Sequence, residues 1–197
     1  ARTLIVKDAR GRVTRIETRR IASMHDPHLC ALQFDVTPLN YSGAIRIRSA
    51  LDGRVINDNV ARYRELNQKH LAPVSQGKTG NTVFLHTQTN RSKYQIVMHA
   101  KTNMYQGKRR LRSGGEIQKG RGYIAEIFTL NMAENTTCRL EKMVSIFTSL
   151  DEGIKNPRTA GRRALSGVKS FAEVYRPHVR AWANIWKTAD IRIEGDR

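Results

Sequence analysis

Apolar and polar side chains alternate with period two through most of the first 150 residues, as in strands of a half-buried antiparallel sheet. In residues 45–48, the pattern places Ile45 and Ile47 on the core face and Arg46 and Arg48 in water. Residues 123–128 carry apolar side chains at both odd and even positions, so we expect both faces of that strand to be covered. Further strands are expected at 4–7, 13–23, 29–37, 82–89, 94–100 and 140–147.

Turn signals rich in Gly, Asn, Asp and Ser separate these strands, at residues 8–11, 40–43, 51–53, 77–80 and 113–115. Many short strands at this spacing are typical of a sandwich or barrel and not of βαβ units. The sequence therefore predicts a mainly β fold built from antiparallel strands.

The pattern changes after residue 151 to helical periodicity. Pro157 precedes a short helix expected from Thr159 to near Gly167. In a second expected helix, apolar residues recur at steps of three and four: Phe171, Val174, Tyr175, His178, Ala181, Trp182, Ile185 and Trp186.

Two local features shape the expected second helix. Ser170 and Glu173 have the spacing of a capping box. Pro177 lies inside the pattern, where it removes a helical hydrogen bond and predicts a kink, unless a new helix starts there. Residues 190–196 alternate again, which predicts the beginning of a strand.

The net charge is unusual, because 35 Lys and Arg against 17 Asp and Glu give +18, enough to attract polyanions non-specifically. The cations are spread along the chain and are densest in residues 107–122, beside Tyr105 and Tyr123. Such charges could contact phosphates, and aromatics could stack on single-stranded bases. Aromatics make up only 7% of the chain, and no nucleic-acid-binding motif occurs. A solvated loop is favoured, and binding of nucleic acid or another polyanion stays the alternative function.

Motifs for phosphate or metal binding are incomplete. Gly77-Lys78-Thr79 lacks the earlier glycine of a phosphate-binding loop, since position 72 is alanine, and a hairpin turn is favoured. The His25-Asp26-Pro27-His28 segment predicts a turn, because Pro27 argues against a helix that would align both histidines. Cys30 and Cys138 are expected to be buried free thiols.

No catalytic pair stands out either. Carboxylates that could act in pairs lie in expected turns or loops without a feature that would raise a pKa: Asp52, Asp58, Glu65, Asp151 and Glu152. We therefore name no catalytic, cofactor-binding or metal-binding residue and expect no cofactor. Because there is no secretory h-region and no run of 18 apolar residues, we expect a cytoplasmic protein without a membrane partner.

Two blocks of sequence carry a resemblance to a known family. The first runs through residues 18–29, 37–43, 51–57, 60–63 and 70–74, and the second through residues 178–182, 185–186 and 190–196. Their succession resembles the N-terminal domain and linker of glycoside hydrolase family 65, which includes maltose, trehalose and kojibiose phosphorylases and related hydrolases.

The resemblance implies an antiparallel β super-sandwich of the galactose mutarotase type, with two large sheets face to face. Residues 1–152 would be part of that sandwich, 153–189 a helical linker, and 190–197 the start of an (α/α)6 catalytic barrel. The match starts partway through the domain, so the first part of the sandwich is expected outside this sequence.

The resemblance also implies a function. The chain would be a non-catalytic fragment of an inverting enzyme that phosphorolyses or hydrolyses an α-linked disaccharide, with its general acid Glu in the barrel. Its partners would be its own barrel, which binds the disaccharide and phosphate, and a second copy in a homodimer. A stand-alone glycan-binding sandwich is a third hypothesis.

The resemblance suggests a role for two segments. The stripe of Phe171, Tyr175, Trp182 and Trp186 would be a docking face for the barrel, with ordinary helix core as the alternative. The loop Asp52–Glu65 contains groups that hydrogen-bond to sugar hydroxyls: Arg54, Asn57, Asn59, Arg62 and Tyr63. A hairpin turn is the favoured interpretation of residues 52–54, and we do not name the loop as a site.

Overall fold

A computed structural model describes residues 1–57, 68–107, 109–111, 114–191 and 195. The strands are β1 (Arg2–Lys7), β2 (Val13–Ala22), β3 (Leu29–Pro38), β4 (Gly43–Asp52), β5 (Leu71–Thr79), β6 (Thr82–Thr89), β7 (Gln95–Gln106), β8 (Arg109–Leu111), β9 (Glu116–Gly120), β10 (Tyr123–Met132) and β11 (Cys138–Thr148). Two helices follow, α1 (Pro157–Ser166) and α2 (Phe171–Ala189).

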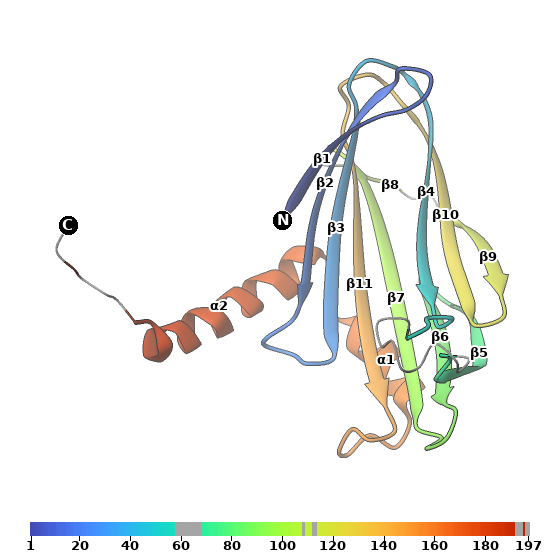
Figure 1. Ribbon diagram of the computed structural model, residues 1–197, viewed down its shortest axis with the longest axis vertical. Coiled ribbons are helices and arrows are strands. Elements are labelled where there is room, and N and C mark those ends of the chain that lie inside the picture. The colour runs from blue at the N-terminus through green and yellow to red at the C-terminus, as the bar shows by residue number, and fades with distance from the viewer. Residues whose placement is uncertain (58–67, 108, 112–113, 192–194, 196–197) are drawn as a thin grey trace.

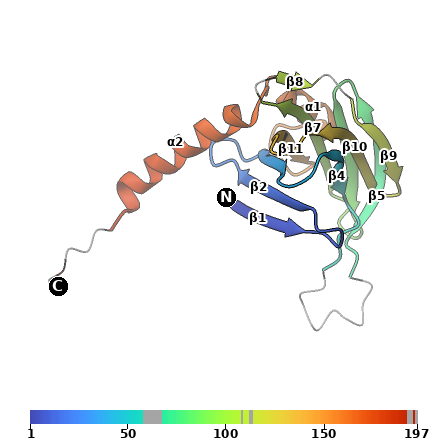
Figure 2. The same ribbon diagram turned by 90° about the horizontal axis from the view of Figure 1, so that it is seen from above.

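The strands form two antiparallel sheets of unequal size. The large sheet has the order β1-β2-β3-β11-β7-β6-β5, with β8 paired to β7, and the small sheet has the order β4-β10-β9. The small sheet faces one side of the large sheet, and the helices lie on the other side (Figures 1 and 2). The mainly β antiparallel prediction is confirmed. The second sheet has only three strands in the described residues, where the resemblance implied two large sheets.

The predicted alternation accounts for how the small sheet packs. Ile47 of β4 is buried against the large sheet, while Arg46 and Arg48 are exposed. Residues 124–128 of β10 are all buried, so the expectation of a strand covered on both faces is confirmed. Burying alternate side chains of β4 fixes its register, because a slip of one residue would turn both arginines into the core.

The core consists of three clusters. The first lies between the two sheets and consists of Val36, Ile47, Met104, Phe128, Met132, Cys138 and Leu140. The second also lies between the two sheets and consists of Leu51, Val83, Leu85, Ala100 and Ile124. The third lies between the large sheet and the helices: Ala31, Met143, Leu165, Phe171 and Val174.

A polar layer separates the two clusters between the sheets. It consists of Ser49 and Glu126, which are partners across β4 and β10, and of Thr102 and Lys142, which are partners across β7 and β11. The hydroxyls of Ser49 and Thr102 are 3.0 Å apart, and Lys78 Nζ lies 3.3 Å from Glu126 Oε1. Burial lowers the pKa of Lys142 to about 8, an effect that the Glu126 charge partly opposes.

Two segments expected as turns or loops form strands instead. Residues 77–79 are the end of β5, and the turn to β6 follows at Gly80, whose φ is +58°. Residues 109–111 and 116–120 form β8 and β9, where we expected a solvated loop. Pairing with β7 and β10 offsets the weak local strand preference of these basic, glycine-containing segments.

The second helix differs from expectation in its cap, and no new helix starts at its proline. α2 is one helix that continues through Pro177. Ser170 makes no side-chain capping bond, and Glu173 Oε2 instead accepts a hydrogen bond from the Lys169 N–H at 2.7 Å. Residues 190–191 have no regular structure, and most of the strand expected at 190–196 lies outside the described residues.

Candidate functional site

Helix α2 leaves the body of the protein after its first two turns. Phe171 and Val174 are buried, at 2% and 3% exposure, whereas Trp182 and Trp186 are 38% and 56% exposed. Figures 1 and 2 show the rest of the helix projecting away from the large sheet. The projecting part therefore presents apolar side chains that the described residues do not cover.

Polar side chains of the large sheet fix the base of α2. From β7, Lys101 and Asn103 donate hydrogen bonds to the carbonyl oxygens of residues 168–169, at 2.8 and 2.9 Å. From β11, the Glu141 carboxylate accepts a hydrogen bond from the Phe171 N–H at 3.0 Å. Because buried polar groups need such partners, these bonds hold the connection in one position. The sheet thereby sets the direction of α2.

The aromatic rings of α2 form a continuous row along one helix face. We call Phe171, Tyr175, His178, Trp182 and Trp186 the aromatic stripe. Successive ring centroids are 5.6, 6.3, 6.5 and 6.3 Å apart, within the range of favourable aromatic contacts. The predicted single-face arrangement is confirmed. Trp182 and Trp186 are not part of the core formed by the described residues, because both side chains are exposed.

Strand β2 and the turn after it contact the start of the stripe. The Arg19 guanidinium lies 5.3 Å from the Phe171 ring centroid, a cation–π contact. His178 Nδ1 accepts a hydrogen bond from the Met24 N–H at 3.1 Å. Among the described residues, no hydrogen bond or ring contact joins α2 to the sheets beyond His178.

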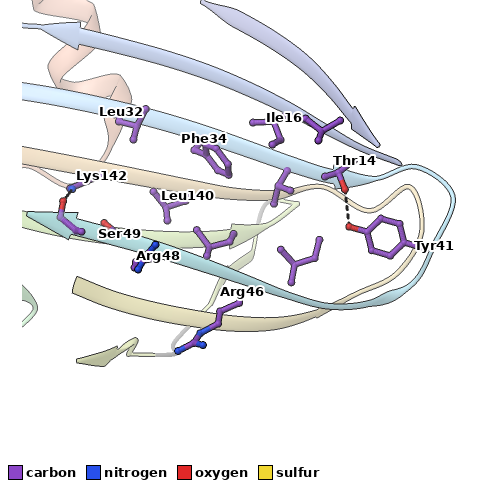
Figure 3. A pocket seen from close by; sticks show the side chains of 15 residues that line it. Thr14, Ile16, Leu32, Phe34, Tyr41, Arg46, Arg48, Ser49, Leu140 and Lys142 are labelled. Carbon is purple, nitrogen blue, oxygen red and sulfur yellow. Dashed lines mark hydrogen bonds between the residues drawn. The ribbon is translucent and has the colours of Figure 1, made fainter. Parts of the chain in front are cut away.

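A second feature is a groove between β4 and the inner face of β2, β3 and β11. Its volume is about 570 Å³, and its walls are mainly apolar, with Ile16, Leu32 and Phe34 among them. Figure 3 shows Lys142 near one end, and near the other a hydrogen bond of 2.8 Å between the Thr14 and Tyr41 hydroxyls.

The loop considered as a sugar-contacting segment is described only from Asp52 to Asn57. Asp52 Oδ1 accepts a hydrogen bond from the Arg54 N–H at 3.0 Å. The Arg54 guanidinium forms an ion pair with the Asp52 carboxylate and lies 4.5 Å from the centroid of the Tyr123 ring. This pairing lowers the pKa of Asp52. Asp58, Asn59, Arg62, Tyr63 and Glu65 lie outside the described residues.

Two of the other candidate residues lie together, with 3.6 Å between His28 Nδ1 and Asp151 Oδ2. His28 stacks on Phe147 with 3.9 Å between ring centroids, and Asp151 accepts hydrogen bonds from Thr148. Within the part of the chain that the structure describes, no group of three or more His, Cys, Asp or Glu could hold a metal ion. In the same part, no helix is long and apolar enough to cross a membrane.

Curated relatives match nearly the whole chain. An uncharacterized glycosyl hydrolase of Mycobacterium tuberculosis (strain CDC 1551 / Oshkosh) is 32% identical over 99% of this chain and 15% of that protein. The kojibiose phosphorylase of Thermoanaerobacter brockii is 31% identical over 99% of this chain and 26% of that protein. The α,α-trehalose phosphorylase of the same organism is 25% identical over 95% of this chain and 24% of that protein. The chain thus spans no more than about a quarter of these relatives.

A solved structure shares the fold. The chain superposes on "Putative kojibiose phosphorylase from human microbiome" with a TM-score of 0.76 and 14% sequence identity, over 94% of this chain and 23% of that one. The model of the glycosyl hydrolase family 65 N-terminal domain matches residues 1–185. Its match covers the sandwich, α1 and most of α2, and the chain therefore belongs to glycosyl hydrolase family 65 through its N-terminal domain.

Proposed function

We propose that this chain is a non-catalytic support for the catalytic domain of a longer family 65 enzyme, and that the aromatic stripe packs against that domain. The exposed Trp182 and Trp186 on a helix with a fixed base carry this proposal. A rigidly held row of aromatic rings is typical of a surface that becomes buried, because aromatic side chains contribute most of the energy at the centres of interfaces. Monomeric proteins seldom leave such rings together in water.

The parent activity we propose is phosphorolysis or hydrolysis of an α-linked disaccharide by inversion. It is supported by the kojibiose and trehalose phosphorylases among the relatives, of which this chain spans 24–26%. Under this proposal, the disaccharide, phosphate and general acid belong to the rest of the protein. The sandwich then contributes stability and orientation through α2.

The docking role can be tested in the full-length protein with two matched double variants. Trp182→Ala with Trp186→Ala removes two rings of the stripe, whereas Arg180→Ala with Asn184→Ala changes residues on the opposite side of α2. We expect scanning calorimetry to show the single unfolding transition split in two for the tryptophan variant and unchanged for the control. If both variants melt as the parent does, the stripe is not the docking face.

The division of labour can be tested by activity. Full-length protein should release sugar from kojibiose, trehalose or maltose, and measurements with and without inorganic phosphate distinguish phosphorolysis from hydrolysis. Residues 1–197 alone should release none. Turnover by residues 1–197 would overturn the proposed non-catalytic role.

A further inference from the structure

A cavity lies beside β7, between the two strands β6 and β8 that pair with it. Strand β6 pairs with β7 as far as Lys101, and β8 pairs with β7 from Met104 onward. In the described part of the chain, no strand pairs with residues 102–103 on this side of β7. The cavity at this position, which we call the β7 cavity, has a volume of about 600 Å³, within the usual range of small-molecule sites.

The walls of the β7 cavity come from both sheets and combine charged, amide and apolar side chains. They include Lys78 of β5, Asn81 of the turn after β5, Met104 of β7, Arg110 of β8, and Glu126 and Phe128 of β10. A ligand in this cavity would meet hydrogen-bond donors, acceptors and apolar surface together, as in most small-molecule sites.

Glu126 brings a carboxylate with an unused acceptor to this wall. The side chain is buried at 4% exposure, and its Oε1 atom lies 3.3 Å from Lys78 Nζ. The buried Oε2 atom has no hydrogen-bond partner among the described residues. Rotation about the last side-chain bond, which is a soft torsion, turns either oxygen toward the cavity. Because buried polar atoms nearly always have a partner, we expect a donor from a bound molecule at this carboxylate.

The basic and amide side chains of the wall supply donors near this carboxylate. The Lys78 ammonium has N–H groups beyond the one that faces Glu126. The Arg110 guanidinium donates from Nη2 to Asn103 Oδ1 at 2.7 Å and has further N–H groups. The Asn81 amide offers both a donor and an acceptor. Donors and a carboxylate acceptor therefore line the same cavity.

We propose that the β7 cavity binds a small neutral polyhydroxylated molecule, whose hydroxyl groups donate to Glu126 and accept from Lys78 and Arg110. A hydroxyl group is both donor and acceptor, so neighbouring hydroxyls satisfy both kinds of side chain at once. An anion would be repelled by Glu126, and a cation would be repelled by the two basic side chains. Met104 and Phe128 suit the C–H faces of a ring, so the expected ligand class is a monosaccharide or a cyclitol.

Methyl NMR of the full-length protein with isotope-labelled methionine tests this binding. Met104 lines the cavity, whereas Met24 is exposed in the turn after β2 and serves as the internal control. We expect glucose or myo-inositol to shift the Met104 signal, assigned through Met104→Leu, to saturation with a dissociation constant of about 0.1–10 mM. The Met24 signal should stay in place. If neither compound shifts the Met104 signal at about 100 mM, the proposal is wrong.

Two matched double variants of the full-length protein locate the binding. Asn81→Ala with Arg110→Ala removes two polar side chains of the cavity, whereas Asn131→Ala with Arg91→Ala removes the same residue types from exposed positions away from it. The cavity variant should raise the dissociation constant at least about tenfold, because it loses hydrogen bonds to the ligand, and the control should keep the parent value. Equal dissociation constants for the two variants would contradict the proposal.

Salt and inorganic phosphate distinguish a neutral ligand from an anion. The affinity for glucose should change by less than about twofold between about 0.05 and 0.5 M NaCl, because screening does not act on a neutral molecule. A shift of the Met104 signal with inorganic phosphate, and none with glucose or myo-inositol, would identify an anion site and overturn the proposal. Because Met104 lines the cavity itself, the outcome depends neither on docking of the aromatic stripe nor on the reaction of the parent enzyme.

Discussion

Gly161 of α1 lies so close to His99 of β7 that a Cβ atom at position 161 would be 2.7 Å from the His99 Nδ1 atom. The same Cβ would be 3.1 Å from Ser145 Oγ, which donates a hydrogen bond to the Gly161 carbonyl at 2.8 Å. Helix α1 therefore rests on the large sheet through a glycine, because only a residue without Cβ permits this approach.

We predict that Gly161→Ala destabilises the protein by about 1–3 kcal/mol, the usual cost of overpacking. The higher helix propensity of alanine recovers only part of this loss, up to about 1 kcal/mol. Urea unfolding measures the difference. Gly167→Ala is the matched control, because a Cβ there meets nothing within 4 Å and its φ of −80° suits alanine. If both substitutions cost the same, the close approach is not what requires glycine.

His99 should make stability depend on pH. Burial, with the charges of Arg158 and Arg162, lowers the pKa of His99 from 6.5 to about 4. The unfolded chain therefore takes up this proton first as the pH falls, and the free energy of unfolding decreases from pH 6.5 down to about pH 4. The full difference in the pKa of His99 corresponds to a decrease of at most about 3 kcal/mol in the free energy of unfolding.

The variant His99→Gln isolates this dependence. Its free energy of unfolding, measured by urea denaturation at pH 4, 5, 6 and 7, should fall less steeply than that of the parent protein. The exposed His25→Gln variant should keep the parent slope. An identical slope for His99→Gln would show that another group causes the acid sensitivity.

Glu126 should be the most sensitive member of the polar layer. Its side chain is buried at 4% exposure, ion-paired with Lys78 and close enough to Lys142 to affect its pKa. Glu126→Ala should cost about 1–3 kcal/mol, because it removes the charge that opposes the desolvation of the largely buried Lys142. Glu116→Ala, on an exposed position of β9, should change the free energy of unfolding by less than about 0.5 kcal/mol.

The cysteines should react with thiol reagents at different rates. Both are free, and Cys138 is buried while Cys30 is partly exposed. Burial and the nearby charge of Asp35 raise the pKa of Cys138 to about 11, so at pH 8 roughly one thiol in a thousand is ionised. Ellman's reagent should modify Cys30 slowly in the native protein and Cys138 only after denaturation. Rapid reaction of both would contradict the burial of Cys138.

The sequence by itself determined where the strands with clear alternation lie. Residues 82–89 were predicted as a strand and form β6 with the same bounds, and the stripe of α2 follows from its three- and four-residue steps. These features depend only on neighbouring residues within one strand or one helix, so the order of apolar and polar side chains is enough to predict them. The family resemblance, carried by short blocks of residues, is confirmed by the match of the family model to residues 1–185.

Only the tertiary structure decided which segments pair and which faces are covered. Strand β5, whose pairing with β6 is irregular between Pro73 and Ser75, was not predicted, and β8 and β9 were expected as loop. Their pairing partners lie elsewhere in the chain, so no local pattern reports them. The exposure of Trp182 is likewise set by which distant segments lie beside α2. Periodicity states which side of a helix or strand is apolar, but what covers that side depends on the whole assembled fold.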